Sequence, residues 1–133
     1  ELVVEDAQLD VAKQLNQVQN MVANGVDAIV VNPVDGAATP ALTKLATDAG
    51  IPLVYVNHPP AEHAAMPAGT SFVGSNEIDS GTMQTKAVCE MLGGKGKVLV
   101  LMGPLENEAS LTRTKDIEDV IAAEPCTGME IID

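Results

Sequence analysis

The sequence predicts an α/β fold with a doubly wound, mostly parallel sheet. Short aliphatic runs alternate along the chain with segments whose apolar residues recur at helical spacing, and Gly, Pro and Asn separate them. The strand-like runs are apolar throughout, which is typical of parallel strands that are covered on both faces. Strands and helices that alternate in this way form βαβ crossovers.

The elements can be assigned in order from these patterns and from capping residues. Asp10 is expected to cap the first helix because its carboxylate can accept from free amides of the first turn, and Gly25 is expected to end that helix. In chain order we expect a strand at residues 2–5, the helix between Asp10 and Gly25, a strand at 28–31, a helix at 36–49, strands at 53–56 and 71–73, a helix at 77–92 capped by Ser75 or Asn76, a strand at 98–101, a helix at 108–123 and a strand at 129–132.

Composition narrows the classes of partner. The chain has 133 residues with 19 acidic and 7 basic side chains, and its net charge is −12. Nucleic acids and anionic membranes attract basic surfaces, so neither is an expected partner of this segment. Aromatic residues make up only 2%, namely Tyr55 and Phe72, and they offer no platform on which bases or sugars could stack.

The segment is expected to be truncated at both ends. It opens on the strand-like residues 2–4 without an initiator Met, and it stops on the strand-like residues 131–132. No signal sequence is recognised, and no apolar run approaches the ~20 residues that span a bilayer. Residues 93–96, Gly-Gly-Lys-Gly, are the most linker-like stretch; they precede a strand, unlike a phosphate-binding loop, and are interpreted as a connector.

The cysteines and histidines give no metal-binding spacing. Cys89 and Cys126 are far apart and are interpreted as two separate thiols; a disulfide would require the fold to bring them together. His58 and His63 lie in a Pro-rich loop without further ligands nearby. We therefore expect no metal and no other cofactor.

Candidate ligand-binding residues follow the strands, because ligands of doubly wound sheets bind beyond the carboxyl ends of the strands. No nucleophile elbow, catalytic pairing or nucleotide loop is present, so an enzyme is not expected. Asn and Arg can each grip adjacent hydroxyls of a neutral ligand. The candidates are Asn32 and Asp35, then Asn57 and His58, then residues 74–76, then Glu106, Asn107 and Arg113.

Six segments in order resemble one family. They are residues 2–8, 14–19, 25–35, 49–54, 72–76 with Gly81, and 96–103 followed by an Arg on the next helix. Together they look like the type I periplasmic sugar-binding proteins of ABC transporters. The resemblance implies residues 1–92 as an amino-terminal lobe that lacks its first strand and helix, residues 93–96 as hinge, and residues 97–133 as the start of a second lobe.

The resemblance also implies a function and a site. A monosaccharide or polyol would bind between the lobes and pass to a membrane permease, in the periplasm or outside the cell, with a lipoprotein anchor possible. Asn57, His58, Asn107 and Arg113 fall on family ligand positions. Asn32 and Asp35 match family residues that shape the turn and are interpreted as structural, and Asp116 stands where the family commonly has Gly. If the segment is isolated, a partner copy could complete its sheet by strand exchange.

One alternative shares the fold. The effector-binding domain of a lactose-repressor-type transcription regulator would look similar, with its DNA-binding head upstream of Glu1. The strongly acidic charge and the stretches at residues 5–8 and 31–35 favour the transporter branch.

Overall fold

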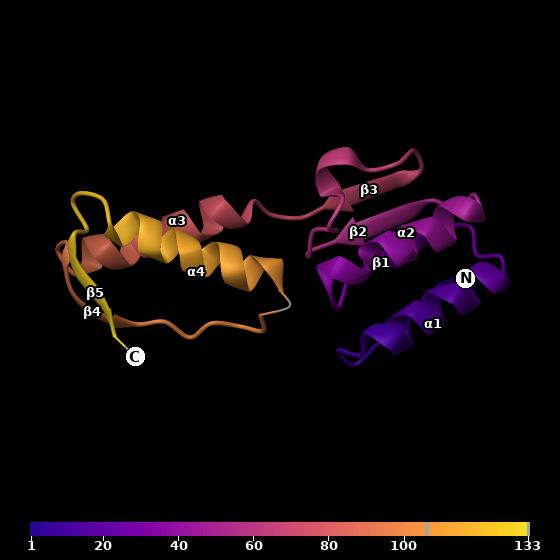
Figure 1. The fold of residues 1–133 in the computed structure, drawn as a ribbon, viewed down its shortest axis with the longest axis horizontal. Coiled ribbons are helices and arrows are strands. Elements are labelled where there is room, and N and C mark those ends of the chain that lie inside the picture. Colours follow the sequence, from indigo (N-terminus) through magenta and orange to yellow (C-terminus); the bar gives the residue numbers. More distant parts are fainter. Residues whose placement is uncertain (106, 133) are drawn as a thin grey trace. The chain divides into compact units, whose positions relative to one another are not determined.

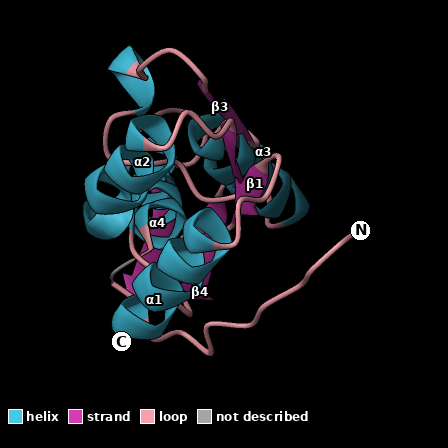
Figure 2. Ribbon diagram, turned by 90° about the vertical axis from the view of Figure 1, so that its right-hand side faces the viewer, coloured by secondary structure: helices cyan, strands magenta, loops and turns pink. Residues whose placement is uncertain are grey.

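The computed structural model describes residues 1–105 and 107–132, and the chain forms two compact units, Glu1–Gly74 and Ser75–Asp133 (Figure 1). Figure 2 distinguishes the helices, strands and loops by colour. Each unit contains parallel strands and two long helices. The α/β class and the parallel pairing predicted from the sequence are confirmed.

The first unit contains a three-stranded parallel sheet in the order β1-β2-β3. Helices α1 and α2 pack against each other, and α2 also contacts β2. The elements are α1 (Val11–Ala23), β1 (Ile29–Val31), the 3₁₀ turn η1 (Gly36–Ala38), α2 (Thr39–Asp48), β2 (Leu53–Val56), the 3₁₀ turn η2 (His63–Ala65) and β3 (Thr70–Val73).

Aliphatic side chains from the sheet and from both helices form the core of this unit. Ile29, Leu53 and Tyr55 point from the strands and are almost completely buried. Leu42 on α2 and Val18 on α1 pack against them. This burial explains why the strand runs are apolar, since removing such side chains from water contributes roughly 1.5–3 kcal/mol each.

Local capping sets the start of α1. The Asp10 carboxylate accepts from the Lys13 amide at 2.9 Å, and the helix ends before Gly25, which has φ +66°. The predicted boundaries of this helix are confirmed. The expected helix at 36–49 is also present, although its first turn is the 3₁₀ turn η1.

The strand predicted at residues 2–5 is wrong. Residues 1–7 form no strand in the structure, and Leu2 and Val4 are more than three-quarters exposed. Contacts from α1 hold this segment: Gln17 donates from Nε2 to a Glu5 carboxylate oxygen at 3.3 Å and to the Asp6 carbonyl at 3.1 Å. A strand needs a hydrogen-bonded neighbour, and none of the described strands pairs with these residues.

The second unit consists of two helices packed on each other and a two-stranded parallel sheet. Its small core consists of Val120, Met129 and the two cysteines. Asn76 caps the first helix by accepting from the Ile78 amide, as expected. The elements are α3 (Glu77–Met91), β4 (Lys95–Leu99), α4 (Glu108–Ile121) and β5 (Gly128–Ile132).

A disulfide joins Cys89 and Cys126, so the interpretation of separate thiols is wrong. The Cα atoms are 5.7 Å apart although 37 positions separate the residues in sequence. Strands β4 and β5 are parallel and begin side by side, with Lys95 opposite Gly128. The end of α3, which precedes β4, therefore lies next to the turn that precedes β5. The sequence spacing carried no information about this proximity.

Strand β4 begins earlier than predicted. Lys95 pairs with Gly128 and Gly96 with Met129, so part of the expected linker at residues 93–96 belongs to the β4–β5 ladder. The expected strand at 98–101 therefore shifts to Lys95–Leu99. The hinge assignment of residues 93–96 remains a prediction. Within residues 1–105 and 107–132, every helix is too short or too polar to cross a membrane.

Candidate functional site

The carboxyl ends of the three strands of the first unit lie at the same end of its sheet, because all three strands run parallel. Asn57 follows β2 with φ +66°, a left-handed conformation that Asn adopts more readily than most residues. Its backbone amide donates to the Val73 carbonyl at 3.0 Å, and its side-chain Nδ2 lies 3.5 Å from Oδ1 of Asn32. Asn57 is therefore placed beside the ends of both neighbouring strands.

His58 is oriented by the loop that follows β1. Its Nδ1 lies 3.0 Å from the carbonyl oxygen of Pro33. A carbonyl can only accept, so Nδ1 carries the proton in this contact. The structure thus brings Asn57 and His58, two of the predicted ligand-binding residues, next to the loop that contains Asn32 and Pro33.

Gln14, which the sequence analysis did not single out, fixes the same loop from helix α1. Its Nε2 donates to the Asn32 carbonyl at 2.9 Å, and its Oε1 accepts from the Val34 amide at 3.0 Å. A single amide therefore satisfies two backbone groups that follow β1. No sequence pattern indicated this contact, because Gln14 and Asn32 are 18 positions apart.

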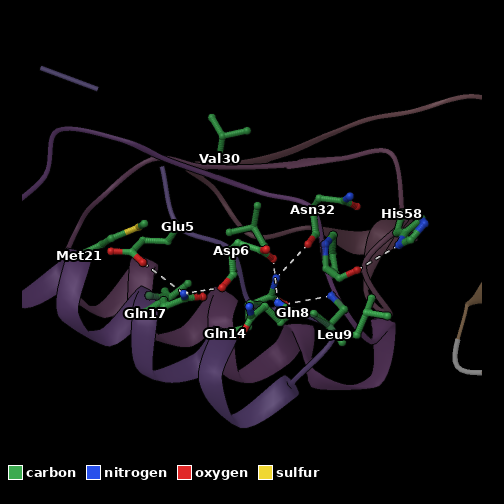
Figure 3. A pocket seen from close by; sticks show the side chains of 15 residues that line it. Glu5, Asp6, Gln8, Leu9, Gln14, Gln17, Met21, Val30, Asn32 and His58 are labelled. Carbon is green, nitrogen blue, oxygen red and sulfur yellow. Dashed lines mark hydrogen bonds between the residues drawn. The ribbon is translucent and has the colours of Figure 1, made fainter. Parts of the chain in front are cut away.

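A hollow of about 330 Å³ lies between α1, β1 and the amino-terminal segment (Figure 3). Its polar lining comes from amides, carboxylates and His58, whereas Met21 and Val30 make part of it apolar. Val30 is 66% exposed on the outer strand of the sheet. The polar lining residues are Glu5, Asp6, Gln8, Gln14, Gln17, Asn32 and His58.

A buried hydrogen-bond network holds the loop that carries Asn57 and His58. Glu62, further along this loop, accepts from the hydroxyls of Thr43 at 2.5 Å and Thr39 at 3.0 Å, both on α2. The Tyr55 hydroxyl lies 2.8 Å from that of Thr43 and donates to the Thr39 carbonyl at 3.0 Å. Burial raises the pKa of Tyr55 to about 12, so the phenol remains a donor at neutral pH.

Asn107 caps α4 in the second unit. Its Oδ1 accepts from the Ala109 amide at 3.0 Å, as the first free amides of a helix require. The side chain thus has a structural task besides the ligand contact that the sequence predicts for it. Glu106, the neighbouring candidate, lies outside the described residues.

Arg113, on the second turn of α4, forms an ion pair with Glu77 at the start of α3. Arg113 Nε donates to Glu77 Oε2 at 2.5 Å, and Ser75 Oγ donates to Glu77 Oε1 at 2.7 Å. The Glu77 side chain is 9% exposed and that of Arg113 is 44% exposed. Sequence reasoning identified Arg113 but missed Glu77, since 36 positions separate the two.

Helices α3 and α4 lie close together at Gly81. A Cβ atom there would lie 2.6 Å from Asp116 Oδ2 and 3.1 Å from the Cα of Arg113. Asp116 is buried, and its Oδ2 has no hydrogen-bond partner among the residues that the structure describes. Asp116 stands at the position where we expected Gly from the family resemblance.

The four predicted site residues fall into two pairs. Asn57 and His58 lie in the first unit, and Asn107 and Arg113 lie in the second. Within residues 1–105 and 107–132, no group of three His, Cys, Asp or Glu side chains has the proximity that a metal ion requires.

These features define a class: a parallel α/β protein in which Asn32, Asn57 and His58 follow strands of one unit and Arg113 lies on a helix of the other. Residues 1–133 match the family described as periplasmic binding protein domain. The chain belongs to this family, and the resemblance to its type I sugar-binding members is confirmed.

Individual relatives are similar over almost the whole chain. A putative rhizopine-binding protein of Rhizobium meliloti is 56% identical over 132 residues, which are 99% of this chain and 43% of that protein. A xylitol-binding protein of Mycolicibacterium smegmatis is 35% identical over 127 residues, 94% of this chain and 35% of that protein. The chain therefore spans less than half the length of these relatives.

A solved structure shares the fold closely. The solute-binding protein of an ABC transporter from Bacillus halodurans, with bound myo-inositol, superposes with a TM-score of 0.87 at 32% identity. The match covers 99% of this chain and 44% of that protein. These relatives and this structural neighbour are named as binding proteins.

Proposed function

We propose that this chain is part of the solute-binding component of an ABC transporter, which captures a monosaccharide or polyol between two lobes and delivers it to a membrane permease. The observation that carries the proposal is the family membership together with neutral amides and one Arg at strand and helix ends. Rhizopine, xylitol and myo-inositol, which the relatives' names mention, support a hydroxyl-rich ligand.

The side chains at the strand ends fit the chemistry of such a ligand. Each hydroxyl both donates and accepts, and the carboxamide of Asn57 offers one group of each kind. The guanidinium of Arg113 offers parallel donors to two adjacent hydroxyl oxygens. We propose Asn57, His58, Asn107 and Arg113 as ligand contacts. None of these roles requires bond making, and we propose that the protein is not an enzyme.

The Cys89–Cys126 disulfide supports a location outside the cytoplasm, in the periplasm or at the cell surface, because disulfides persist in oxidising compartments. A lipoprotein anchor would be compatible with this location. The alternative, an effector domain of a lactose-repressor-type regulator, would be cytoplasmic and is not favoured by the disulfide. The similarity to named transport and binding proteins also favours transport.

The lobe organisation is proposed in two forms. The sequence favours residues 1–92 as the first lobe, 93–96 as hinge and 97–133 as the beginning of the second. The compact units instead favour a boundary after Gly74. In either form a further strand of the first lobe would pair with the open edge of β1, next to Val30, and in an isolated segment a second copy could supply that strand.

Calorimetry of the intact protein against pentoses, hexoses, linear polyols and inositols tests the proposal. We expect one of these compounds to bind with a Kd in the micromolar range or below, on the order of −8 kcal/mol. Arg113→Ala should weaken that binding at least tenfold while Lys115→Ala, on the same helix but paired with Asp119, should not. A protein that binds none of these compounds would contradict the proposed function.

A further inference from the structure

Glu77 is the buried partner of Arg113. It occupies the first position of α3 and presents Oε2 to Arg113 Nε at 2.5 Å, while Oε1 accepts from Ser75 at 2.7 Å. Only 9% of its side chain is exposed. A carboxylate is rarely buried to this degree without a partner, because the loss of hydration must be offset by charge-assisted hydrogen bonds.

The contact constrains the orientation of Arg113. A guanidinium that donates through Nε is held by its inner edge, and its remaining N–H donors lie on the two Nη atoms at the outer edge. The Arg113 side chain is 44% exposed. The backbone beneath it is also fixed, because Gly81 of α3 approaches the Cα of Arg113 closely. Glu77 thus limits the rotamers of an otherwise flexible side chain.

The contact also changes the charge that a ligand meets. Glu77 and Arg113 together carry no net charge, and the carboxylate lies within hydrogen-bond distance of the guanidinium. A neutral hydroxyl-rich ligand can still accept from the Nη donors. An anionic ligand would gain from Arg113 but would be repelled by the nearby, poorly hydrated carboxylate.

We propose that Glu77 is the positioning residue of the sugar site: it orients Arg113 toward the ligand and biases the site toward neutral ligands over anionic ones. This inference rests on the proposed function. Glu77 itself does not contact the ligand in this proposal, and it acts through the Arg113 side chain.

The test compares Glu77→Gln with Asp79→Asn in the intact protein. Gln keeps the shape of Glu77 but weakens the pairing. Asp79 is an exposed acid in the same helix turn, and its carboxylate accepts from Asn76 Nδ2 at 2.9 Å. The probes are the neutral sugar or polyol that the wild type binds and a sugar acid of the same ring size. Calorimetry measures both affinities, and thermal unfolding checks the fold.

We expect Glu77→Gln to weaken binding of the neutral ligand about tenfold, the lower end of what loss of an outer-shell partner costs a metal site. The preference for the neutral ligand over the sugar acid should narrow, and Asp79→Asn should change neither quantity. In an Arg113→Lys background Glu77→Gln should have little further effect on affinity, because its route to the ligand is already lost.

The outcomes separate the two proposals. If the wild type binds no sugar or polyol, the proposed function fails. If it binds one and Glu77→Gln leaves its affinity unchanged, or if the losses from Glu77→Gln and Arg113→Lys simply add, Glu77 does not position Arg113. If affinity falls but the ratio of neutral to acidic ligand stays constant, the charge bias is overturned. Hydrogen exchange at Arg113 Nε–H gives a readout without ligand. Exchange should be slow in the wild type and about tenfold faster in Glu77→Gln, because the hydrogen bond to the charged carboxylate must open before the proton exchanges.

Discussion

Gly81 shows how one residue sets the distance between two helices. A Cβ at this position would lie 2.6 Å from Asp116 Oδ2 and 2.7 Å from Asp116 Cβ, closer than packed atoms approach. In an open helix, replacing Gly with Ala would stabilise the fold by about 1 kcal/mol. Here the neighbouring helix occupies the space, so the sign of the effect should reverse.

We expect Gly81→Ala to lower the free energy of unfolding by about 1–3 kcal/mol, the usual range for overpacking a well-packed contact. Urea unfolding of the intact protein, followed by circular dichroism, measures the loss. The matched variant Gly81→Ala/Asp116→Gly restores the space from the α4 side and should recover most of it. A stabilising Gly81→Ala would show that α3 and α4 are not held at this distance.

At this scale the sequence allowed candidate ligand contacts to be proposed, whereas contacts between side chains far apart in the sequence could not be predicted. Asn57 could be proposed because it follows a strand, and Arg113 because an Arg on the helix after residues 96–103 matches a family pattern. Gln14 and Glu77 could not, because each acts on a residue at least 18 positions away and neither belongs to a local motif. Such contacts exist only once the elements have packed.

Among the elements, α3 and β5 are linked covalently. The Cys89–Cys126 disulfide joins the last turn of α3 to the turn before β5, and both sulfur-bearing residues are at most 3% exposed. The core of this unit is small, so a cross-link contributes much of its stability. The cross-link acts mainly by limiting the conformations of the unfolded chain between the two cysteines.

Replacing both cysteines by Ser should lower the free energy of unfolding of this unit by about 4 kcal/mol, the loop-entropy value for a separation of 37 positions. Urea unfolding under non-reducing conditions measures the loss. Dithiothreitol should destabilise the wild type by a similar amount and leave the double Ser variant unchanged. An equal midpoint for wild type and double variant would contradict a stabilising role.

Helices and strands were predicted correctly where local side chains mark their ends. The prediction failed where pairing with a distant strand determines whether a strand forms and where it begins. Asp10 and Asn76 mark helix starts by their own side chains, and both caps are present. Residues 2–5 have the composition of a strand but lack a described neighbour to pair with. Strand β4 begins inside a Gly-rich stretch because β5 pairs with it there, which composition alone could not indicate.

At the scale of the whole molecule, both units leave apolar strand surface uncovered. Val30 on β1 is 66% exposed, and Leu99 on β4 is 62% exposed. Leu2, Val4 and Leu101 are also exposed by at least 80%. Unpaired, apolar strand edges readily add another strand, either from the same chain or from a second copy. The segment as given is therefore a candidate for self-association.

We expect an isolated segment of residues 1–133 to form dimers or larger species at micromolar concentration, measured by size exclusion with light scattering. Ile29 donates its amide to the Pro52 carbonyl, so the Val30 amide, which alternates with it, faces the open edge of the sheet. Val30→Lys places a charge on this edge strand and should shift the segment toward the monomer of 13.8 kDa. Met83→Lys is the matched control, because Met83 is equally exposed, at 66%, but lies on helix α3. A wild-type segment that stays monomeric, or an equal effect of both Lys variants, would show that the β1 edge does not drive association.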